Sequence, residues 1–444
     1  MMKAPCILFL CLVGTTFAFP EHLFGSRQFA DPDPVVKHWA LLVAGSNGWY
    51  NYRHQADICH AYQILHKHGI PDEQIVVMMY DDIANNEENP NKGVIINKPN
   101  GPNVYPGVPK DYTAEDVTPE NFLALLQGEK PQSCNMCSGK TLKSDSNDHV
   151  FVYFADHGAT DLIAFPDGEL EKDDLMKVLK KMHRQQKFGK LVFYLEACES
   201  GSMFDGMSKD LNIFATTAAN PDESSWGYYC NNSMDNCLGD EYSIHWMEDS
   251  DVEDLSTETL DKQFHIVKQE TKKSHPQEYG NLTMSSATVN QYQASQGGEM
   301  HIMKDVLVRE QTPISELDFV PSREVEMTML YRRLMKTTHP TDRDAILKKI
   351  MVLAQTQRNI IQTMRSIIMS VTSDPEAVEA HLQRPEQLRV VDSVCYHSAV
   401  KLFSDTCFRL GQNDYAMGII YAFANMCNEN VPQDRILNAI KNVC

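Results

Sequence analysis

Short, almost continuously apolar runs alternate with helical patterns through the first half of the chain, and this alternation limits the possible folds. The runs are residues 38–45 (HWALLVAG), 75–80 (IVVMMY), 149–155 (HVFVYFA), 190–197 (KLVFYLEA) and 212–217 (NIFATT). Strands that are apolar on both sides are typical of parallel sheets with helices packed on both faces. The sequence therefore predicts an α/β/α sandwich with a mostly parallel sheet.

Helical spacing of apolar residues separates these runs and takes over completely towards the C-terminus. Residues 56–68, 119–126 and 173–186 are predicted helices between the strands. Long helices are expected again at 324–335 and 342–371. We expect four parts: a signal peptide, an α/β domain, a linker and an all-helical domain with disulfides. Their expected bounds are 1–18, 19–284, 285–323 and 324–444.

The N-terminal segment has the pattern of a secretory signal. Lys3 supplies the positive start, residues 7–13 the apolar run, and residues 16–18 (TFA) a small-residue cleavage site. No later apolar run reaches the ~18–20 residues that a membrane span needs. We therefore expect a protein without a membrane span, in the secretory or endosomal route or outside the cell.

Such a compartment permits disulfides and glycans. Cys134 and Cys137 are expected to form a local bridge or to stay as two idle thiols, rather than to bind a metal. Cys230 and Cys237 are expected to bridge, and Cys59 to be a core thiol. Four C-terminal cysteines predict two disulfides, with the pairing left open: Cys395, Cys407, Cys427 and Cys444. The two sequons place possible glycans at Asn231 and Asn281.

Charge excludes one class of partner and divides the chain. The formal net charge is −20, so a nucleic acid held by a general basic field is not expected. Residues 324–444 hold 14 basic and 13 acidic side chains, whereas residues 1–323 hold 26 and 47. The acidic run 248–254 could suggest a cation site, but it does not match a calcium-binding loop.

Two of the predicted strands end on chemically capable residues. HVFVYFA runs into Asp156, His157 and Gly158, and KLVFYLEA runs into Cys198. In a parallel sheet both ends lie at the same edge, where ligands bind, so a thiol nucleophile and an imidazole base can meet there. Gly158 suits a backbone N–H that approaches an oxyanion. The alternative is that Cys198 packs as a small apolar residue and His157 satisfies a strand end.

The carboxylates on either side of Cys198 argue against a reactive thiol. Glu196 and Glu199 flank it, and neighbouring carboxylates hold a thiol in its protonated, poorly nucleophilic form. Either the cysteine is structural, or these side chains have other roles.

Six long blocks, in order, resemble the legumain family of asparaginyl endopeptidases. They are HWALLVAGSNGWYNYRHQADICHAYQ, NPNKGVIINKPNGPNVYPGVPKDYTAEDVTP, FADHG, FYLEACESGSMF, ATTAANPDESS and LGDEYSIHWMEDSD. The resemblance runs from about residue 38 to residue 444. It implies a caspase-like fold, cleavage after Asn and less readily after Asp, and a zymogen whose helical tail covers the active site until acid removes it.

The resemblance also implies a role for each matched residue. Cys198 would be the nucleophile, His157 the base and Asn51 the residue that orients the imidazole, with the N–H groups of Gly158 and Cys198 as the oxyanion hole. Asp156 would be able to cyclise to a succinimide, a feature linked to ligase activity. The implied P1 pocket consists of Arg53, His54, Glu196, Ser225 and Asp240. Less supported wall residues are Glu199, Ser200 and Ser224.

The implied pocket makes chemical sense for asparagine. A carboxamide has one acceptor oxygen and two donor hydrogens. Arg53 can donate to the oxygen, and Glu196 and Asp240 can accept from the NH₂ group. A P1 aspartate would face both carboxylates, so it should bind only when it is protonated, at low pH.

Partners follow from the same resemblance. We expect protein and peptide substrates, the chain's own C-terminal prodomain as inhibitor and cystatin-type inhibitors, in a lysosomal, endosomal or secreted setting. No cofactor and no metal are expected. The acidic part would attract basic patches on the prodomain, and acid would weaken that attraction. A peptide ligase on the same site, or an inhibitor formed by the helical domain alone, are the competing hypotheses.

The chain departs from the family pattern at two places. Lys336 stands where an asparagine is commonly cleaved, and an RGD-like tripeptide is Gln127-Gly128-Glu129 here. The substitutes for the cleavage site cannot be ranked from the sequence: Asn281, Asn290, Asp318, Asp342 and Asp344.

Overall fold

The computed structural model describes residues 1, 36–135, 137–295 and 315–444. The predicted signal peptide and much of the predicted linker lie outside these residues. Within them, no helix is long and apolar enough to cross a membrane.

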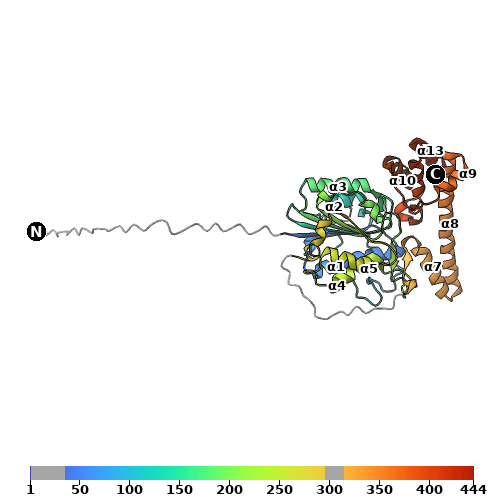
Figure 1. The fold of residues 1–444 in the computed structure, drawn as a ribbon. Coiled ribbons are helices and arrows are strands. Elements are labelled where there is room, and N and C mark those ends of the chain that lie inside the picture. The colour runs from blue at the N-terminus through green and yellow to red at the C-terminus, as the bar shows by residue number, and fades with distance from the viewer. Residues whose placement is uncertain (2–35, 136, 296–314) are drawn as a thin grey trace. The chain divides into compact units, whose positions relative to one another are not determined.

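A six-stranded sheet forms the centre of the α/β part (Figure 1), with strand order β11-β8-β7-β3-β1-β2. Five neighbouring strands run parallel, and β11 pairs antiparallel with β8 at one edge. The strands are β1 (His38–Ala44), β2 (Ile75–Met78), β3 (His149–Ala155), β7 (Lys190–Glu196), β8 (Ile213–Thr217) and β11 (Gln277–Gly280). The mostly parallel sheet is therefore confirmed.

Helices cover both faces of this sheet. Helices α2 (Pro119–Leu126) and α3 (Lys172–Arg184) lie on one side, and α1 (Tyr52–Lys67), α4 (Glu241–Val252) and α5 (Leu260–Glu270) on the other (Figure 1). Each strand supplies both cores, because successive side chains point to opposite faces. Along β1, Leu42 belongs to one buried cluster and Leu41 to the other. The α/β/α sandwich is confirmed.

Two small antiparallel sheets extend from the edge where β3 and β7 end. One consists of β4 (Gly158–Ala159), β5 (Leu162–Ala164) and β6 (Glu169–Glu171). The other has β9 (Trp226–Tyr228) between β10 (Gly239–Asp240) and β12 (Val320–Pro321). The second sheet joins residues on both sides of the segment 296–314.

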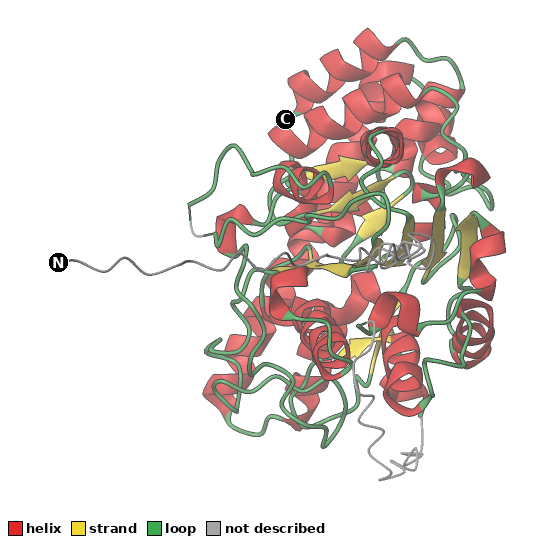
Figure 2. Cartoon of the chain, turned by 90° about the vertical axis from the view of Figure 1, so that its left-hand side faces the viewer, coloured by secondary structure: helices red, strands yellow, loops and turns green. Residues whose placement is uncertain are grey.

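The C-terminal part is helical throughout (Figure 2). Its helices are α7 (Val325–Lys336), α8 (Pro340–Thr372), α9 (Pro375–His381), α10 (Ser393–Thr406), α11 (Asp414–Met417), α12 (Tyr421–Asn428) and α13 (Gln433–Val443). Helices α8 to α13 bury a common apolar core that includes Met364, Phe403 and Phe423, whereas α7 packs through Leu330 and Leu334 against the first half of α8. The all-helical C-terminal region is confirmed, with both long helices close to their predicted bounds.

Residues 285–295, expected at the start of the linker, pack against the sheet instead. Helix α6 (Asn290–Gln293) contacts β1 and β3. The His149 ring hydrogen-bonds to the carbonyl of Gln291 at 2.9 Å, and the His38 ring bonds to that of Ala294. The sequence of this segment is polar and has no helical or strand period, so it did not predict the contact. Backbone carbonyls of the segment, rather than its side chains, accept these two hydrogen bonds.

Four disulfides are present among the described residues. They join Cys134 to Cys137, Cys230 to Cys237, Cys395 to Cys427, and Cys407 to Cys444. The structure thereby decides the C-terminal pairing that the sequence left open. Cys59 and Cys198 are buried and free.

Candidate active site

Parallel pairing in register brings His157 and Cys198 to one edge of the sheet. Ala155 of β3 lies opposite Glu196 of β7, and each strand then continues for two residues to its reactive side chain. The Asp156 N–H donates to the Glu196 carbonyl at 3.0 Å, which extends the ladder into the site. Cys198 and His157 are 1% and 3% exposed, so the chemistry would take place away from bulk water.

Asn51 holds the imidazole in one orientation. Its side-chain oxygen lies 2.8 Å from His157 Nε2, and its own amide donates to the Asn47 carbonyl at 2.9 Å. An Nε2–H that donates to Asn51 leaves the Nδ1 lone pair as the base. Nδ1 is buried and has no hydrogen-bond partner among the described residues. Asn51 lies at the N-cap of α1, so a helix terminus positions this group.

The electrostatic setting keeps this imidazole neutral. Burial lowers the pKa of His157 well below its usual value, and the guanidinium groups of Arg53 and Arg323 lower it further. A neutral imidazole can accept a proton, as a general base must.

The Cys198 sulfur contacts hydroxyl groups on a neighbouring loop. Sγ lies 3.1 Å from Ser224 Oγ and 3.6 Å from Ser225 Oγ. Within the described residues, these are its hydrogen-bond partners, and the imidazole is not among them. The next residue, Glu199, has a φ of 48° in the left-handed region, so the chain turns sharply after the nucleophile. This turn separates Glu199 from Glu196 and directs the two carboxylates to different surroundings.

Gly158 is required by a close backbone approach. A Cβ at this position would lie 2.5 Å from the carbonyl oxygen of Cys198 and 3.0 Å from the Ala197 Cβ. The two backbones therefore lie side by side, as an oxyanion hole built from the N–H groups of Gly158 and Cys198 requires.

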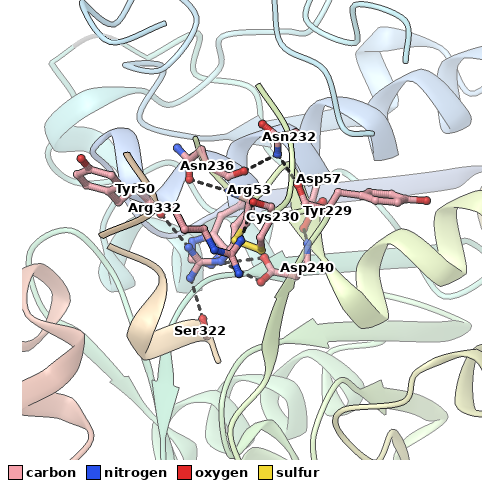
Figure 3. Close-up of a disulfide and its surroundings, with 12 residues drawn as sticks. Tyr50, Arg53, Asp57, Tyr229, Cys230, Asn232, Asn236, Asp240, Ser322 and Arg332 are labelled. Atoms are coloured by element: carbon pink, nitrogen blue, oxygen red, sulfur yellow. Dashed lines mark hydrogen bonds and ion pairs between the residues drawn. A yellow bond between two sulfur atoms is a disulfide. The ribbon is translucent and has the colours of Figure 1, made fainter. Parts of the chain in front are cut away.

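Arg53 is the centre of a buried polar cluster that includes Asp240 and Ser322 (Figure 3). It is fully buried, and its Nε donates to Asp240 Oδ1 at 2.9 Å. His54 Nε2 lies 3.5 Å from the other oxygen of Asp240. Glu196 interacts electrostatically with Asp240 and Arg53, and the Ser225 carbonyl is linked to Arg53 through Ser322, so the structure brings the five residues of the implied P1 pocket into one region.

Two carboxylate oxygens of this pocket have no hydrogen-bond partner among the described residues. They are Glu196 Oε1 and Asp240 Oδ2, both buried. Burial raises the pKa of Glu196, and repulsion from Asp240 raises it further. Burial also raises the pKa of Asp240, although Arg53 opposes this effect. Buried polar atoms without partners are costly, so these two oxygens indicate where a ligand would donate hydrogen bonds.

The Cys230–Cys237 disulfide braces the wall of the pocket (Figure 3). On β9, Gly227 pairs with Asp240 of β10, and a Cβ on Gly227 would lie 2.9 Å from the Cys237 sulfur. Arg332 of α7 donates to the Cys230 carbonyl at 2.9 Å. The expected bridge is confirmed, and it packs against β9, the strand that pairs with the one carrying Asp240.

Sequence reasoning missed a second layer of polar residues beneath the pocket. Asp57 accepts from the Asp240 N–H at 3.1 Å and from Asn97 at 2.7 Å. Ser243 donates to Glu196, and Tyr153 donates to Ser243. A tyrosine inside the apolar run HVFVYFA was the available signal, because a buried hydroxyl needs a partner.

The chain's own C-terminal part occupies the site. β12 pairs antiparallel with β9, and the Ser322 N–H donates to the Ser225 carbonyl at 3.0 Å, as an extended peptide would. The Ser322 hydroxyl accepts from Arg53 Nη2 at 2.7 Å (Figure 3). Arg323 then donates to the Gly158 carbonyl at 2.5 Å and to Glu199 Oε2 at 2.6 Å.

Two more C-terminal side chains reach the catalytic edge. Arg384 also pairs with Glu199, which is 1% exposed and thus shared by two guanidinium groups. Asp414 Oδ2 lies 3.8 Å from His157 Nδ1, the nitrogen that is free to act as base. Residues beyond 320 therefore contact Glu199, the pocket and the imidazole of His157.

Among the described residues, two groups of His or carboxylate side chains bring possible metal ligands within 4.8 Å of one another. The first is His54, Asp156 and His157, which belongs to the site already described. The second is Asp249, Glu253 and Glu258, where Lys262 Nζ lies 2.8 Å from Glu253 and 3.2 Å from Glu258. An ammonium group therefore already supplies positive charge there.

A thiol and an oriented imidazole at one edge of a parallel sheet, with a peptide strand seated beside them, define a cysteine endopeptidase. Comparison with known proteins agrees: residues 38–295 match the model of the peptidase C13 family, and residues 347–444 match the legumain prodomain. The chain therefore belongs to the peptidase C13 family.

Relatives cover almost the whole chain. Legumain of Rattus norvegicus is 48% identical over 416 residues, which are 93% of this chain and 94% of that protein. The vacuolar-processing enzyme of Vicia sativa is 40% identical over 445 residues, covering 94% and 89%. Among solved structures, caspase-1 from Spodoptera frugiperda aligns with a TM-score of 0.35 at 11% identity, covering 60% of this chain and 96% of that one.

Proposed function

We propose that this enzyme hydrolyses peptide bonds after asparagine, and less readily after aspartate in acid. The observation that carries the proposal is the polarity of the pocket. The buried guanidinium of Arg53 acts electrostatically on Glu196 and Asp240, each of which has one buried oxygen without a hydrogen-bond partner among the described residues. That set matches one C=O and one NH₂ group, and a buried polar site strongly rejects groups that leave it unpaired.

The proposed mechanism assigns each catalytic group one step. The Cys198 sulfur attacks the P1 carbonyl carbon while His157 Nδ1 takes the thiol proton. The N–H groups of Gly158 and Cys198 stabilise the oxyanion. His157 returns the proton to the leaving amine, and water then hydrolyses the thioester and regenerates the thiol. Asn51 keeps the imidazole in the required tautomer.

Aspartate at P1 would need a proton to enter this pocket. In its ionised form it would place a third carboxylate beside Glu196 and Asp240, and only Arg53 would oppose the repulsion. Acid removes that conflict by protonating the substrate or the pocket, so cleavage after aspartate should be confined to low pH.

The C-terminal part is proposed to act as an inhibitory prodomain. Ser322 takes the P1 place, where its hydroxyl binds Arg53 but leaves Glu196 Oε1 and Asp240 Oδ2 without hydrogen-bond donors in the part of the chain that the structure describes. It is thus a weaker occupant than asparagine. Basic prodomain residues meet acidic ones of the catalytic part: Arg333 and Lys349 lie 2.6 and 3.0 Å from Glu88. Lys336 lies 2.5 Å from Asp235. Acid would weaken these pairs and release the prodomain.

The activating cut remains a proposal among several positions. Lys336 ends α7 and is held by its ion pair, and Asp318 is 9% exposed within a capping box. Asp342 and Asp344 are exposed but helical, whereas Asn281 caps a 3-10 turn. Because proteases bind extended peptides, each helical position would have to unwind before cleavage.

The proposed setting is the secretory pathway to the lysosome or endosome, or secretion. Glycans are proposed at Asn231 and Asn281, of which Asn231 is exposed and Asn281 partly so. Cystatin-type inhibitors are proposed partners, because a blocking segment can use the antiparallel edge of β9 as β12 does.

Peptide ligation from the same acyl-enzyme is the second candidate, and Asp156 favours it. Both oxygens of its carboxylate are buried without hydrogen-bond partners among the described residues, and burial raises its pKa well above the usual value. A protonated carboxyl can be attacked by the His157 backbone nitrogen, which forms a C–N bond and releases water as the succinimide closes. An amine would then compete with water for the thioester.

One assay separates these functions. The acid-activated protein is offered peptides that differ only in Asn, Asp, Gln or Arg at P1, with and without an added amine, and the products are identified by mass spectrometry. We expect cleavage after Asn, with Cys198→Ala as the inactive control. Equal cleavage of all four peptides, or activity in Cys198→Ala, would refute the proposal.

A further inference from the structure

The two oxygens of Glu196 have different surroundings. Oε2 accepts from the Ser243 hydroxyl at 2.9 Å and from the Ser243 N–H at 3.2 Å. Oε1 is buried and accepts from no group among the described residues. One oxygen is therefore anchored to the protein, and the other faces the pocket.

The anchor is itself held from behind. The Tyr153 hydroxyl, on β3 in the core, donates to Ser243 Oγ at 2.7 Å. Tyr153, Ser243 and Glu196 are 0%, 0% and 1% exposed, so water does not compete with these bonds. Because the Ser243 oxygen accepts from Tyr153, its own proton is directed to Glu196. The hydrogen bonds thus run in one direction, from tyrosine to serine to glutamate.

We propose that Tyr153 and Ser243 are positioning residues for P1 specificity, acting through Glu196. They rotate the carboxylate so that Oε1 alone faces the side chain of the substrate, as an acceptor for the carboxamide NH₂. The inference rests on the proposed asparaginyl activity and deepens it. It adds two residues to the determinants of specificity, neither of which touches the substrate.

The same arrangement decides where a proton binds. Oε2 already accepts from two donors, so a proton taken up by Glu196 goes to Oε1. The pocket then presents an O–H donor in place of an acceptor. A donor at this point fits an oxygen of aspartate and not the NH₂ of asparagine. Protonation of Glu196 on Oε1 therefore converts the pocket from one that accepts Asn to one that tolerates Asp.

Other charged groups around Glu196 act on its protonation but do not anchor it. Arg53 and Asp57 face it from α1, and Asp240 from the start of α4. The hydroxyls of Tyr153 and Tyr242 are the remaining titratable neighbours. Only Ser243 donates to Oε2 among the described residues, and its two hydrogen bonds favour the ionised form of Glu196. Its removal should therefore move Glu196 protonation to higher pH.

The test compares Ser243→Ala and Tyr153→Phe with a matched control, Tyr194→Phe. Tyr194 lies opposite Tyr153 in the sheet, is also buried, and donates to Gln263 at 2.6 Å. Activated enzymes are assayed with P1-Asn and P1-Asp peptides from pH 4 to 7. For Ser243→Ala we expect the Asn:Asp ratio of kcat/KM to fall about tenfold, the size of one hydrogen bond to a charged group.

Further arms distinguish positioning from packing. In Ser243→Ala the highest pH at which Asp is cleaved should rise, and Ser243→Thr, which keeps the hydroxyl, should restore both properties. Tyr153→Phe should change the Asn:Asp ratio and the pH limit for Asp cleavage in the same direction by smaller amounts. Tyr194→Phe should change neither quantity. Tyr153→Phe removes a single oxygen atom, so it decides the question if Ser243→Ala fails to fold.

An unchanged Asn:Asp ratio and pH limit in folded Ser243→Ala would overturn the inference. Equal effects of Tyr153→Phe and Tyr194→Phe would also overturn it, because they would report core packing. If the wild-type enzyme shows no preference for Asn, the proposed function fails instead. A wild-type preference that all variants retain refutes the positioning role alone.

Discussion

Asn51 and His157 lie 106 residues apart in the sequence and are joined by a hydrogen bond of 2.8 Å. The bond connects the start of α1 to the end of β3, so the helix that supplies Arg53 and His54 to the pocket also sets the orientation of the base. In the proposed mechanism, catalysis and specificity therefore depend on the same turn of helix.

Replacing Asn51 by Ala should reduce kcat and leave KM nearly unchanged. The imidazole would lose its fixed tautomer and rotate, and we expect a loss of about 10²-fold, at the lower end of the range for general acid–base catalysis. Steady-state kinetics with a P1-Asn peptide measure the two constants. A rise in KM with constant kcat would show that Asn51 serves substrate binding instead.

Glu199 should couple the contributions of Arg323 and Arg384 to the docking of the prodomain. Arg323→Ala or Arg384→Ala each leaves Glu199 with one guanidinium, whereas the double variant leaves a buried carboxylate without either. We expect each single change to raise the activity of the uncleaved proprotein about tenfold, and the double change to exceed the product of the two.

The control for this prediction is Arg409→Ala. Arg409 pairs with Asp167 on the surface, where both side chains are more than half exposed and an ion pair contributes little. Its activity should match that of the wild type. Equal effects of all three arginines would mean that general charge, and not the shared Glu199, holds the prodomain.

Glu88 should contribute to acid release. Burial acts to raise the pKa of Glu88, but hydrogen bonds from Lys349 and Arg333 outweigh it, so the pKa lies below its ordinary value of 4.5. A depressed pKa stabilises the closed state above the ordinary pKa, and this stabilisation is lost as pH falls through the depressed value. Glu88→Gln should therefore open about two- to fivefold more readily at pH 6 and behave like the wild type near pH 3.

The rate of Cys198 alkylation in the full-length protein measures this opening. Glu87→Gln is the matched control, because it removes the same charge from the adjacent, exposed position. Indistinguishable alkylation of the Glu87 and Glu88 variants at pH 6 would contradict the prediction.

Asp414 should weaken the docking of the prodomain near neutral pH, whereas Glu88 should strengthen it. Partial burial beside the active site raises the pKa of Asp414 from 3.8 to about 6, although Arg53 and Arg323 oppose the shift and the side chain is still 32% exposed. A raised pKa favours the docked state below the ordinary value, and this contribution is lost as pH rises towards 6. Asp414→Asn cannot ionise, so its prodomain should stay docked more firmly at pH 7, and the pH of half-opening should fall.

Alkylation of Cys198 across pH 4 to 7 measures that midpoint as well. Asp405→Asn, on an exposed aspartate of α10 paired with Lys401, provides the control. A higher midpoint in Asp414→Asn would show that the carboxylate attracts the arginines more than burial penalises it.

Local patterns were sufficient for much of the fold. The bounds of β3 and α2 were predicted to the residue, because an apolar run and a Thr-Pro start are unambiguous signals. Helix α1 begins four residues before its predicted start, since Arg53, His54 and Gln55 are polar yet buried. The proposed pocket requires polar residues in the first turn of this helix. That turn therefore lacks the apolar spacing by which a helix is predicted from sequence.

The long-range contacts could not be predicted from the sequence. The positions of His157 and Cys198 at one edge followed from parallel strands, but the Arg323–Glu199 pair and the approach of Asp414 depend on how the C-terminal helices pack. The Tyr153–Ser243–Glu196 bonds join three elements whose sequences show no shared pattern. Cysteine pairing was likewise decided only by the helix packing that brings Cys395 to Cys427.

The four disulfides have a consequence for activation. Cys134–Cys137 and Cys230–Cys237 lie in the catalytic part, and Cys395–Cys427 and Cys407–Cys444 lie in the prodomain. None of these four bridges connects the two parts. In the proposed zymogen, one cut in the intervening chain would therefore turn a tethered inhibitor, present at an effective concentration on the order of millimolar, into a free molecule subject to dilution. After that cut, the fate of the enzyme depends on how many other copies share its compartment.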